Sequence, residues 1–298
     1  MFKENLYLEN RKVLKVSGLN CIGFLNNILT SDITKLLPFE TSPSALLSPQ
    51  GRILYDVLVS LNFQNSSKEK SILIEHDLFC EDDLIKKLNM YNLRREVKVE
   101  KTYYNVFVSL EPKSSINSLT DKRFLKTNVN RIYDKNKSKN FINKCHLSNW
   151  YDLMRYKYCL PEGSKEIETN VTLPLEISLD LIGGLSFEKG CFIGQEVNAR
   201  IKYKGLVKRK YVPIHFKNKN FLFSDLEINN KIFLATQEIG ELIASSLDEE
   251  DNIWYGIAKI KLSQLYLFEE DNKLECDYLG SKIKINFPKY MLPLPRKI

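Results

Sequence analysis

Residues 185–200 read LSFEKGCFIGQEVNAR, and this stretch carries more chemical information than any other part of the sequence. Two glycines flank Cys191 and permit a tight backbone turn that presents the thiol. A short helix is predicted from about Gly194 to Gly205, so that Cys191 lies just ahead of a helix N-terminus with Lys189 nearby. Both influences favour the thiolate, which marks Cys191 as reactive; a buried cysteine in a tight turn is the alternative.

A β-hairpin is the second informative element. Ser48-Pro49-Gln50-Gly51 suits a type I turn, with proline second and glycine fourth. The return strand alternates in side-chain direction, which places Asp56 among apolar residues on one face. A buried carboxylate is costly without a partner. Asp56 therefore either pairs locally, with Arg52 or a backbone donor, or has a functional role.

The order of predicted elements indicates an α+β protein. Strands and helices are mixed and hairpins are common, which argues against a doubly wound parallel sheet. Residues 1–205 form the main region, in which residues 111–147 are rich in Lys, Asn and Ser. They predict a polar surface connection with one or two short strands. Short strand-like runs in residues 206–298 predict a small C-terminal β-barrel domain.

Composition narrows the classes of function. Of the 298 residues, 43% are hydrophobic and 27% charged, as in ordinary folded proteins. No apolar run approaches the ~20 residues of a membrane helix, and the N-terminal residues lack a signal or transit pattern. Six cysteines without a C-x-x-C pair predict no permanently bound metal. The net charge of +7 comes without a nucleic-acid motif, so direct nucleic-acid binding is not expected.

The segment Lys189–Glu196 closely resembles the K-G-C-[YF]-x-G-Q-E signature of the YgfZ-type proteins. That family includes a mitochondrial iron–sulfur cluster assembly factor. The resemblance covers most of residues 10–210, and the matching elements occur in order: Leu29-Thr30-Ser31-Asp32; Leu46–Arg52 with Asp56; Tyr151 and Arg155 before Pro161-Glu162-Gly163; Leu173-Pro174-Leu175-Glu176; Ala199-Arg200; and Gly205.

The resemblance implies an aminomethyltransferase-like (GcvT-like) ring of two α+β folate-binding subdomains, followed by the barrel, with tetrahydrofolate or a one-carbon derivative in a central channel. Glu176 matches the glutamate that holds the pterin ring in related aminomethyltransferases. A carboxylate can accept two N–H bonds from an aminopterin edge; a surface glutamate at a strand end is the alternative. Asp56, Arg52, Arg200 and Lys189 are the other residues expected to bind the cofactor.

The implied function is folate-dependent maturation of iron–sulfur proteins, with [4Fe–4S] proteins as the expected targets. Cys191 would act as a redox thiol or as a transient, shared cluster ligand. One thiol cannot house a cluster alone, so an A-type scaffold protein or a client apo-enzyme is expected as partner. The family's link to tRNA modification is expected to be indirect, through enzymes that need clusters. The expected location is the bacterial cytoplasm, or the mitochondrial matrix in a eukaryote.

The alternative function is a folate-dependent aminomethyltransferase or demethylase. Glycine-cleavage aminomethyltransferases carry paired aspartates where this sequence has Tyr55-Asp56. Replacing a carboxylate by a phenol removes a candidate for activating the folate amine, which counts against this reaction.

A basic segment follows the signature and contains Lys202, Lys204, Lys208, Arg209 and Lys210. It predicts attraction of the acidic polyglutamate tail of cellular folates. A solvated edge strand protected by lysines is the alternative.

Overall fold

The computed structural model describes residues 5–62, 71–110, 118–124, 127–135, 149–217 and 230–296. The chain divides into two compact units, each assembled from several segments. The first, here called the sheet unit, comprises Met1–Ser148, Glu162–Pro174 and Leu179–Val197. The second, the barrel unit, comprises Asn149–Pro161, Leu175–Ser178 and Asn198–Ile298. These compact units differ from the two domains expected from the sequence, residues 1–205 and 206–298. That domain boundary stays a prediction.

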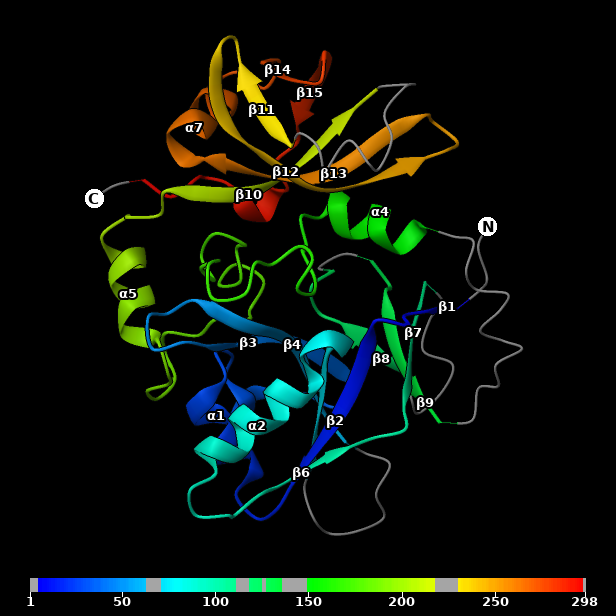
Figure 1. Ribbon diagram of the computed structural model, residues 1–298, viewed down its shortest axis with the longest axis vertical. Coiled ribbons are helices and arrows are strands. Elements are labelled where there is room, and N and C mark those ends of the chain that lie inside the picture. The colour runs from blue at the N-terminus through cyan, green and yellow to red at the C-terminus, as the bar shows by residue number, and fades with distance from the viewer. Residues whose placement is uncertain are drawn as a thin grey trace. The chain divides into compact units, whose positions relative to one another are not determined.

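Nine described strands form one sheet in the sheet unit, in the spatial order β1-β7-β9-β8-β3-β4-β5-β2-β6 (Figure 1). β3 and β8 are parallel, and the other neighbouring pairs are antiparallel. Together with the helices packed on it, this sheet confirms the α+β class. The strands are β1 (Leu6–Tyr7), β2 (Arg11–Ser17), β3 (Glu40–Leu47), β4 (Ile53–Leu61), β5 (Ser71–Asp77), β6 (Lys98–Lys101), β7 (Asn105–Ser109), β8 (Ser118–Asp121) and β9 (Asn130–Asp134).

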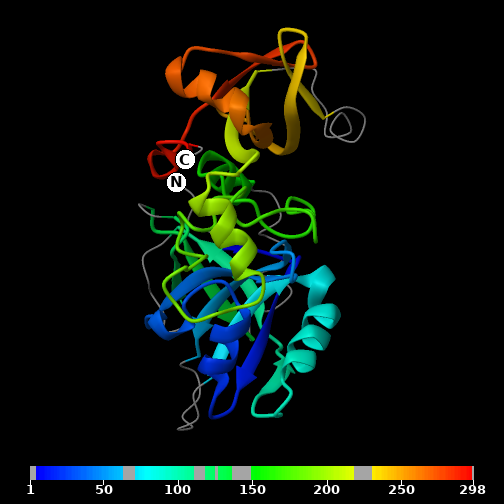
Figure 2. The ribbon, with the colours of Figure 1, turned by 90° about the vertical axis from the view of Figure 1, so that its left-hand side faces the viewer.

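Two helices cover one face of strands β2, β4 and β5 (Figures 1 and 2). They are α1 (Cys21–Ile28) and α2 (Glu81–Tyr91), and short 3-10 turns lie at Ile33–Lys35 and Leu78–Cys80. Alternate residues of each strand point to this face, and each fully buried aliphatic side chain contributes roughly 1.5–3 kcal/mol. The shared core includes Leu14, Val16, Leu25, Val57, Val59, Ile72, Ile74, Leu84 and Leu88. Arg11, Asp56 and Glu75 on the same strands are therefore directed to the opposite face.

The predicted hairpin is confirmed by β3, β4 and the turn between them. The Gly51 amide donates to the Ser48 carbonyl oxygen at 2.8 Å, and Gly51 has φ +77°, a conformation that glycine adopts without strain. On β4, Tyr55 packs against the apolar core beside the helices. Asp56, its neighbour, points to the other face because strand residues alternate. A side chain at position 55 therefore points away from the side chain of Asp56.

Residues 111–147 were expected to form a polar surface connection with one or two short strands. The short strands are confirmed as β8 and β9, but their surface position is wrong: they lie inside the sheet, paired with each other and with β3 and β7. Asp121, Arg131 and Tyr133 are buried. Polar residues can occupy such strands because their charges are compensated by partners from other strands. Residues 111–117, 125–126 and 136–148 lie outside the described residues.

Six described strands close into a barrel in the order β10-β13-β12-β11-β14-β15, which confirms the predicted C-terminal barrel (Figure 1). They are β10 (Arg209–Phe216), β11 (Lys231–Leu234), β12 (Gln237–Asp248), β13 (Ile253–Lys261), β14 (Cys276–Tyr278) and β15 (Ser281–Ile285). Helices α4 (Trp150–Lys157) and α7 (Leu262–Glu270) and a 3-10 turn at Lys289–Met291 complete the unit. None of the helices in the described ranges is both long and apolar enough to span a membrane.

Candidate functional site

The signature loop presents Cys191 to solvent. Cys191 is exposed, whereas the next residue, Phe192, is buried. Helix α5 (Gln195–Tyr203) begins four residues after the thiol, which confirms the predicted helix. The described cysteines other than Cys191 are buried or half-buried. Among the cysteines that the structure describes, Cys191 is therefore the one whose thiol a partner protein can reach.

Lys189 anchors this loop to the end of α1. Its ammonium donates to the backbone carbonyl oxygens of Asn26 at 2.6 Å, Ser31 at 2.8 Å, and Leu29. It also lies 4.7 Å from the centre of the Phe192 ring, a cation–π contact. Burial lowers the pKa of Lys189 to about 8, and the charge of Asp32 opposes this shift.

The three carbonyls use all three N–H donors of the ammonium. Lys189 therefore does not hydrogen-bond the Cys191 thiol, and its electrostatic influence on that thiol stays a prediction. Its contacts make it an anchor of the loop; its predicted part in cofactor binding stays a prediction.

Replacing Lys189 with methionine should release the loop. The three carbonyls would lose their donor, and unsatisfied buried acceptors cost about 1–3 kcal/mol. We expect hydrogen–deuterium exchange of residues 185–194 to rise, with a smaller fall in global stability measured by urea unfolding. Lys98→Met, which removes an exposed ammonium 2.7 Å from Glu100, is the control and should leave exchange in the loop unchanged. Unchanged exchange in Lys189→Met would contradict the anchoring role.

Gly194 joins the signature to the hairpin turn. It has φ +77°, and a Cβ atom there would lie 2.7 Å from the Ser48 carbonyl oxygen and 2.8 Å from the Gly51 Cα. Only a residue without a side chain permits this approach. The two most distinctive motifs of the sequence are thus in direct contact.

Thr30 connects a third motif to the same loop. Its hydroxyl donates to the Gly184 carbonyl at 2.6 Å and accepts from the Ala45 amide at 2.8 Å. Its carbonyl accepts from the Ser186 amide at 3.0 Å. The segment that leads into Cys191 is therefore held against β3.

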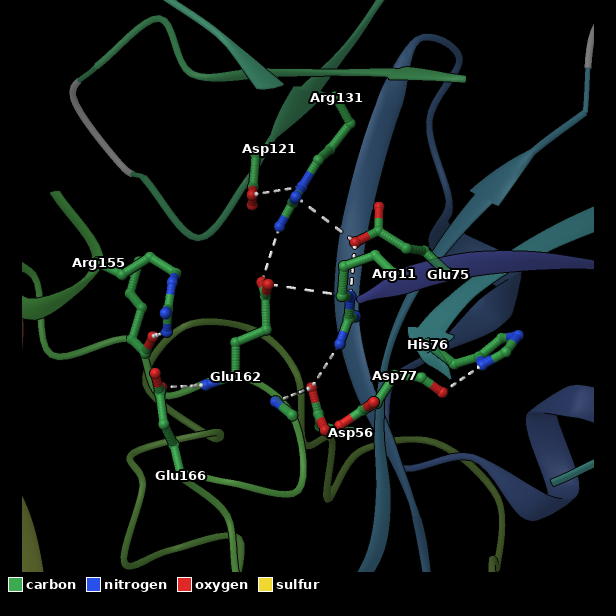
Figure 3. A network of polar contacts seen from close by, with 12 residues as sticks. Arg11, Asp56, Glu75, His76, Asp77, Asp121, Arg131, Arg155, Glu162 and Glu166 are labelled. Atoms are coloured by element: carbon green, nitrogen blue, oxygen red, sulfur yellow. Dashed lines mark hydrogen bonds and ion pairs between the residues drawn. The ribbon is translucent and has the colours of Figure 1, made fainter. Parts of the chain in front are cut away.

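A buried ion network lies on the sheet face opposite the helices (Figure 3). Arg131 on β9 is at its centre and donates to Glu162 at 2.7 Å; its guanidinium also lies 3.3 Å from Asp121 and 3.5 Å from Glu75. Arg11 on β2 donates to Glu75 at 3.0 Å and lies 3.8 Å from Glu162. We define the buried ion network as Arg11, Asp56, Glu75, Asp121, Arg123, Arg131, Tyr133 and Glu162.

Asp56 is the network's most accessible carboxylate. Its side chain is 19% exposed, whereas the side chains of Arg11, Glu75, Asp121, Arg123, Arg131 and Glu162 are at most 6% exposed. One oxygen of Asp56 accepts from Arg11 at 3.4 Å and from the Gly163 amide at 3.2 Å. Asp56 does accept from a backbone donor, but the predicted local pairing is wrong: Gly163 is 107 positions away, and Arg52 donates to the Val171 carbonyl oxygen instead.

The network shifts the pKa values of Asp121, Tyr133 and Arg11. Burial alone would raise the pKa of Asp121, but the charges of Arg123 and Arg131 outweigh it and hold that pKa below its ordinary value. Burial and the Glu75 charge raise the pKa of Tyr133 well above its usual range. Tyr133 therefore stays protonated and donates to Glu75 at 3.0 Å. Arg11 remains charged, because Glu162, Glu75 and Asp56 outweigh burial and raise its pKa.

The remaining predicted site residues are divided between the units. Arg52 is half-buried in the sheet unit. Glu176 and Arg200 belong to the barrel unit, where Glu176 is half-buried and Arg200 is exposed on α5. The structure brings Cys191, Lys189 and the hairpin together within the sheet unit. That Glu176, Asp56, Arg52 and Arg200 line one cavity stays a prediction.

The basic segment is only partly available to a ligand. Lys202, Lys204, Lys208 and Arg209 are exposed. Lys210, which was grouped with them, is buried, and its ammonium donates to the Leu175 carbonyl oxygen at 3.0 Å. Lys210 is thus removed from the expected basic rim, because its position on β10 directs it inward.

Sequence reasoning missed most of the buried ion network. Arg11, Glu75, Asp121 and Arg131 were not singled out from the sequence, because their partners are far away along the chain. Arg11 and Glu75 are separated by 64 positions. The available signal was Glu75 itself, an acid directly after the apolar run Ile72–Ile74. No cluster of three His, Cys, Asp or Glu side chains able to hold a metal occurs among the described residues.

Comparison with known proteins identifies relatives of the chain. No protein-family model matches it. Over 256 residues it is 25% identical to "Iron-sulfur cluster assembly factor IBA57 homolog, mitochondrial" of Yarrowia lipolytica, covering 69% of this chain and 53% of the relative. It is 28% identical over 233 residues to the human mitochondrial factor IBA57 (70% and 65%), and 24% identical over 252 residues to the Dictyostelium discoideum homologue (70% and 61%). The chain thus spans between about half and two thirds of these relatives.

The fold is shared with an aminomethyltransferase. The structure superposes on the crystal structure of glycine cleavage system aminomethyltransferase T from Bartonella henselae with a TM-score of 0.71, covering 96% of this chain and 86% of the other. The sequence identity is 12%, so this likeness concerns the fold.

Proposed function

We propose that this chain, whose homologues are iron–sulfur cluster assembly factors of the YgfZ-type family and whose structure has the aminomethyltransferase fold, is a maturation factor for iron–sulfur proteins. The exposed thiol of Cys191, on a loop anchored by Lys189, carries the proposal. [4Fe–4S] proteins are the expected clients. The relatives are mitochondrial by name, which favours the mitochondrial matrix over a bacterial cytoplasm.

Cys191 serves in this proposal as a transient ligand of a cluster in transit. A thiolate is the usual protein ligand of iron in such clusters, and a stable [4Fe–4S] cluster takes four ligands. A single accessible thiol can share a cluster that is bound mainly by another protein. The partner is accordingly an A-type scaffold protein that delivers the cluster or an apo-enzyme that receives it.

Tetrahydrofolate is the proposed cofactor. The chemistry of two carboxylates fits it, because each can accept N–H bonds from an aminopterin edge. Glu176 is half-buried, and Asp56 is kept in place by Arg11 while 19% of its side chain remains exposed. When bound, the folate would supply a one-carbon carrier; the residues of this chain would bind and orient it.

Rescue of a bacterial strain that lacks its own homologue tests the maturation role. The activity of a [4Fe–4S] enzyme would be measured in cells that carry this chain or an empty vector. We expect restored activity with the chain. If the folded, expressed chain gives no rescue, the maturation role is wrong. Consumption of methylene-tetrahydrofolate with an amine substrate would then identify a one-carbon transferase.

Glu176→Gln should weaken binding of tetrahydrofolate by about 10- to 100-fold. The amide loses the charge that strengthens both N–H bonds, and hydrogen bonds to charged groups are worth roughly 1.5–3 kcal/mol each. Calorimetric titration of the wild type and the variant would measure the effect. Glu241→Gln, a change in a barrel glutamate paired with Lys259 at 3.2 Å, is the matched control. Equal affinity of Glu176→Gln and wild type would remove Glu176 from the site.

A further inference from the structure

Lys210 is a buried lysine, although the basic residues directly before it in the sequence are exposed. It is 3% exposed on β10, whereas Lys208 and Arg209 face solvent. Burying an ammonium is costly unless it is paired and hydrogen-bonded. Its ammonium donates to the carbonyl oxygen of Leu175 at 3.0 Å. This contact connects the barrel wall to the residue directly before Glu176.

The segment Leu175–Ser178 is fastened to β10 at two successive peptides. Besides the Lys210 contact, the Tyr211 amide donates to the Glu176 carbonyl oxygen at 2.8 Å. The side chains on either side of Glu176, Leu175 and Ile177, are buried. The segment then turns sharply at Ser178, which has φ +58°. The backbone of Glu176 is therefore held on both sides.

We propose that Lys210 is a positioning residue for Glu176: its ammonium holds the Leu175 peptide so that the Glu176 carboxylate meets the pterin in one orientation. This inference rests on the proposed folate binding by Glu176. A preordered carboxylate loses less conformational freedom when it binds a ligand. Loss of Lys210 should therefore act on affinity through Glu176, although Lys210 itself does not touch the ligand.

A double-mutant cycle tests this coupling. Tetrahydrofolate would be titrated calorimetrically into the wild type, Lys210→Met, Glu176→Gln and the double variant. We expect Lys210→Met to weaken binding about tenfold, on the order of one hydrogen bond, and to have no further effect when Glu176 is already Gln. Equal losses in both backgrounds, or no loss in either, would overturn the proposal.

A matched control separates positioning from general damage to the barrel. Lys259 is another buried lysine, 6% exposed on β13 and paired with Glu241 at 3.2 Å. Lys259→Met should reduce stability without changing affinity; an equal loss of affinity would overturn the proposal. Lys210→Gln keeps an N–H donor, and it would replace Lys210→Met if that variant did not fold. It should retain part of the affinity.

Hydrogen exchange distinguishes failure of this inference from failure of the proposed cofactor. Lys210→Met should raise exchange of the Ile177 and Ser178 amides, and Lys259→Met should not. Wild-type protein that binds no tetrahydrofolate would show that the proposed cofactor is wrong, and the positioning role would be overturned with it. Wild-type binding with unchanged exchange in Lys210→Met would overturn the positioning role alone.

Discussion

Cells that carry Cys191→Ser should show no more [4Fe–4S] enzyme activity than cells with an empty vector. The substitution exchanges one sulfur for oxygen on an exposed side chain, and a serine hydroxyl does not replace a thiolate as an iron ligand. Surface changes of this kind alter stability by about 0.5 kcal/mol or less, so the fold should be preserved. The measurement is the rescue assay, with urea unfolding of the purified variant beside it.

Cys80→Ser is the matched control for this result. Cys80 is half-buried, and its thiol donates to the Asp77 carbonyl oxygen at 3.1 Å, a bond that a serine hydroxyl can replace. This variant should rescue the cells as the wild type does. Full rescue by Cys191→Ser would end the proposed role of the signature thiol. Loss of rescue in both variants would show that the assay reports damage to the fold.

Arg131→Met should lower the free energy of unfolding by about 3–5 kcal/mol, the usual cost of breaking a buried ion pair. The Arg131 side chain is fully buried, and it contacts Glu75, Asp121 and Glu162. Methionine fills similar space but leaves these carboxylates with fewer positive partners. Urea unfolding at pH 7 would measure the loss. A loss below about 1 kcal/mol would mean that the network adds little net stability.

Arg94→Met provides the exposed counterpart. The Arg94 side chain is 85% exposed and 3.8 Å from Glu96. Exposed pairs of this kind contribute about 0–1 kcal/mol, so this variant should unfold almost as the wild type does. A large loss here would show that charge removal in general, and not burial of the network, destabilises the protein.

The effect of Arg131→Met should also depend on pH. Burial opposes ionisation of Asp121, but Arg123 and Arg131 hold its pKa below the ordinary value. A carboxylate with a lowered pKa stabilises the fold above its unfolded pKa, about 3.9, and this contribution is lost as the pH falls through the lower folded pKa. Removing Arg131 weakens that contribution. The stability difference between wild type and variant should therefore narrow as the pH falls from 7 toward 3.

The network also accounts for the orientation of Asp56. Arg11 binds Glu75 and Asp56 with different nitrogens of one guanidinium, so the position of Asp56 depends on charges on three neighbouring strands. A planar guanidinium presents its donors in a fixed geometry. Tyr55, on the opposite face of β4, takes no part in this arrangement.

The sequence by itself determined the elements that are encoded locally. The turn at Ser48–Gly51, the helix after the signature and the short strands of the barrel follow from turn residues and hydrophobic periodicity within a few positions. The exposure of Cys191 agrees with a glycine-flanked turn. The relatives agree with the family resemblance, which rests on several motifs in order.

Only the tertiary structure decided which charges are buried and what each one contacts. Arg11 and Glu75 are 64 positions apart, and Arg131 and Glu162 are 31 apart. Residues 111–147 read as a polar surface connection with one or two short strands, yet their described strands lie inside the sheet, between β7 and β3. Lys210 read as part of a basic rim, yet it is buried against Leu175. A charged side chain has the same local signature in both settings. Whether it is buried depends on opposite charges and acceptors that strand pairing brings from distant parts of the chain.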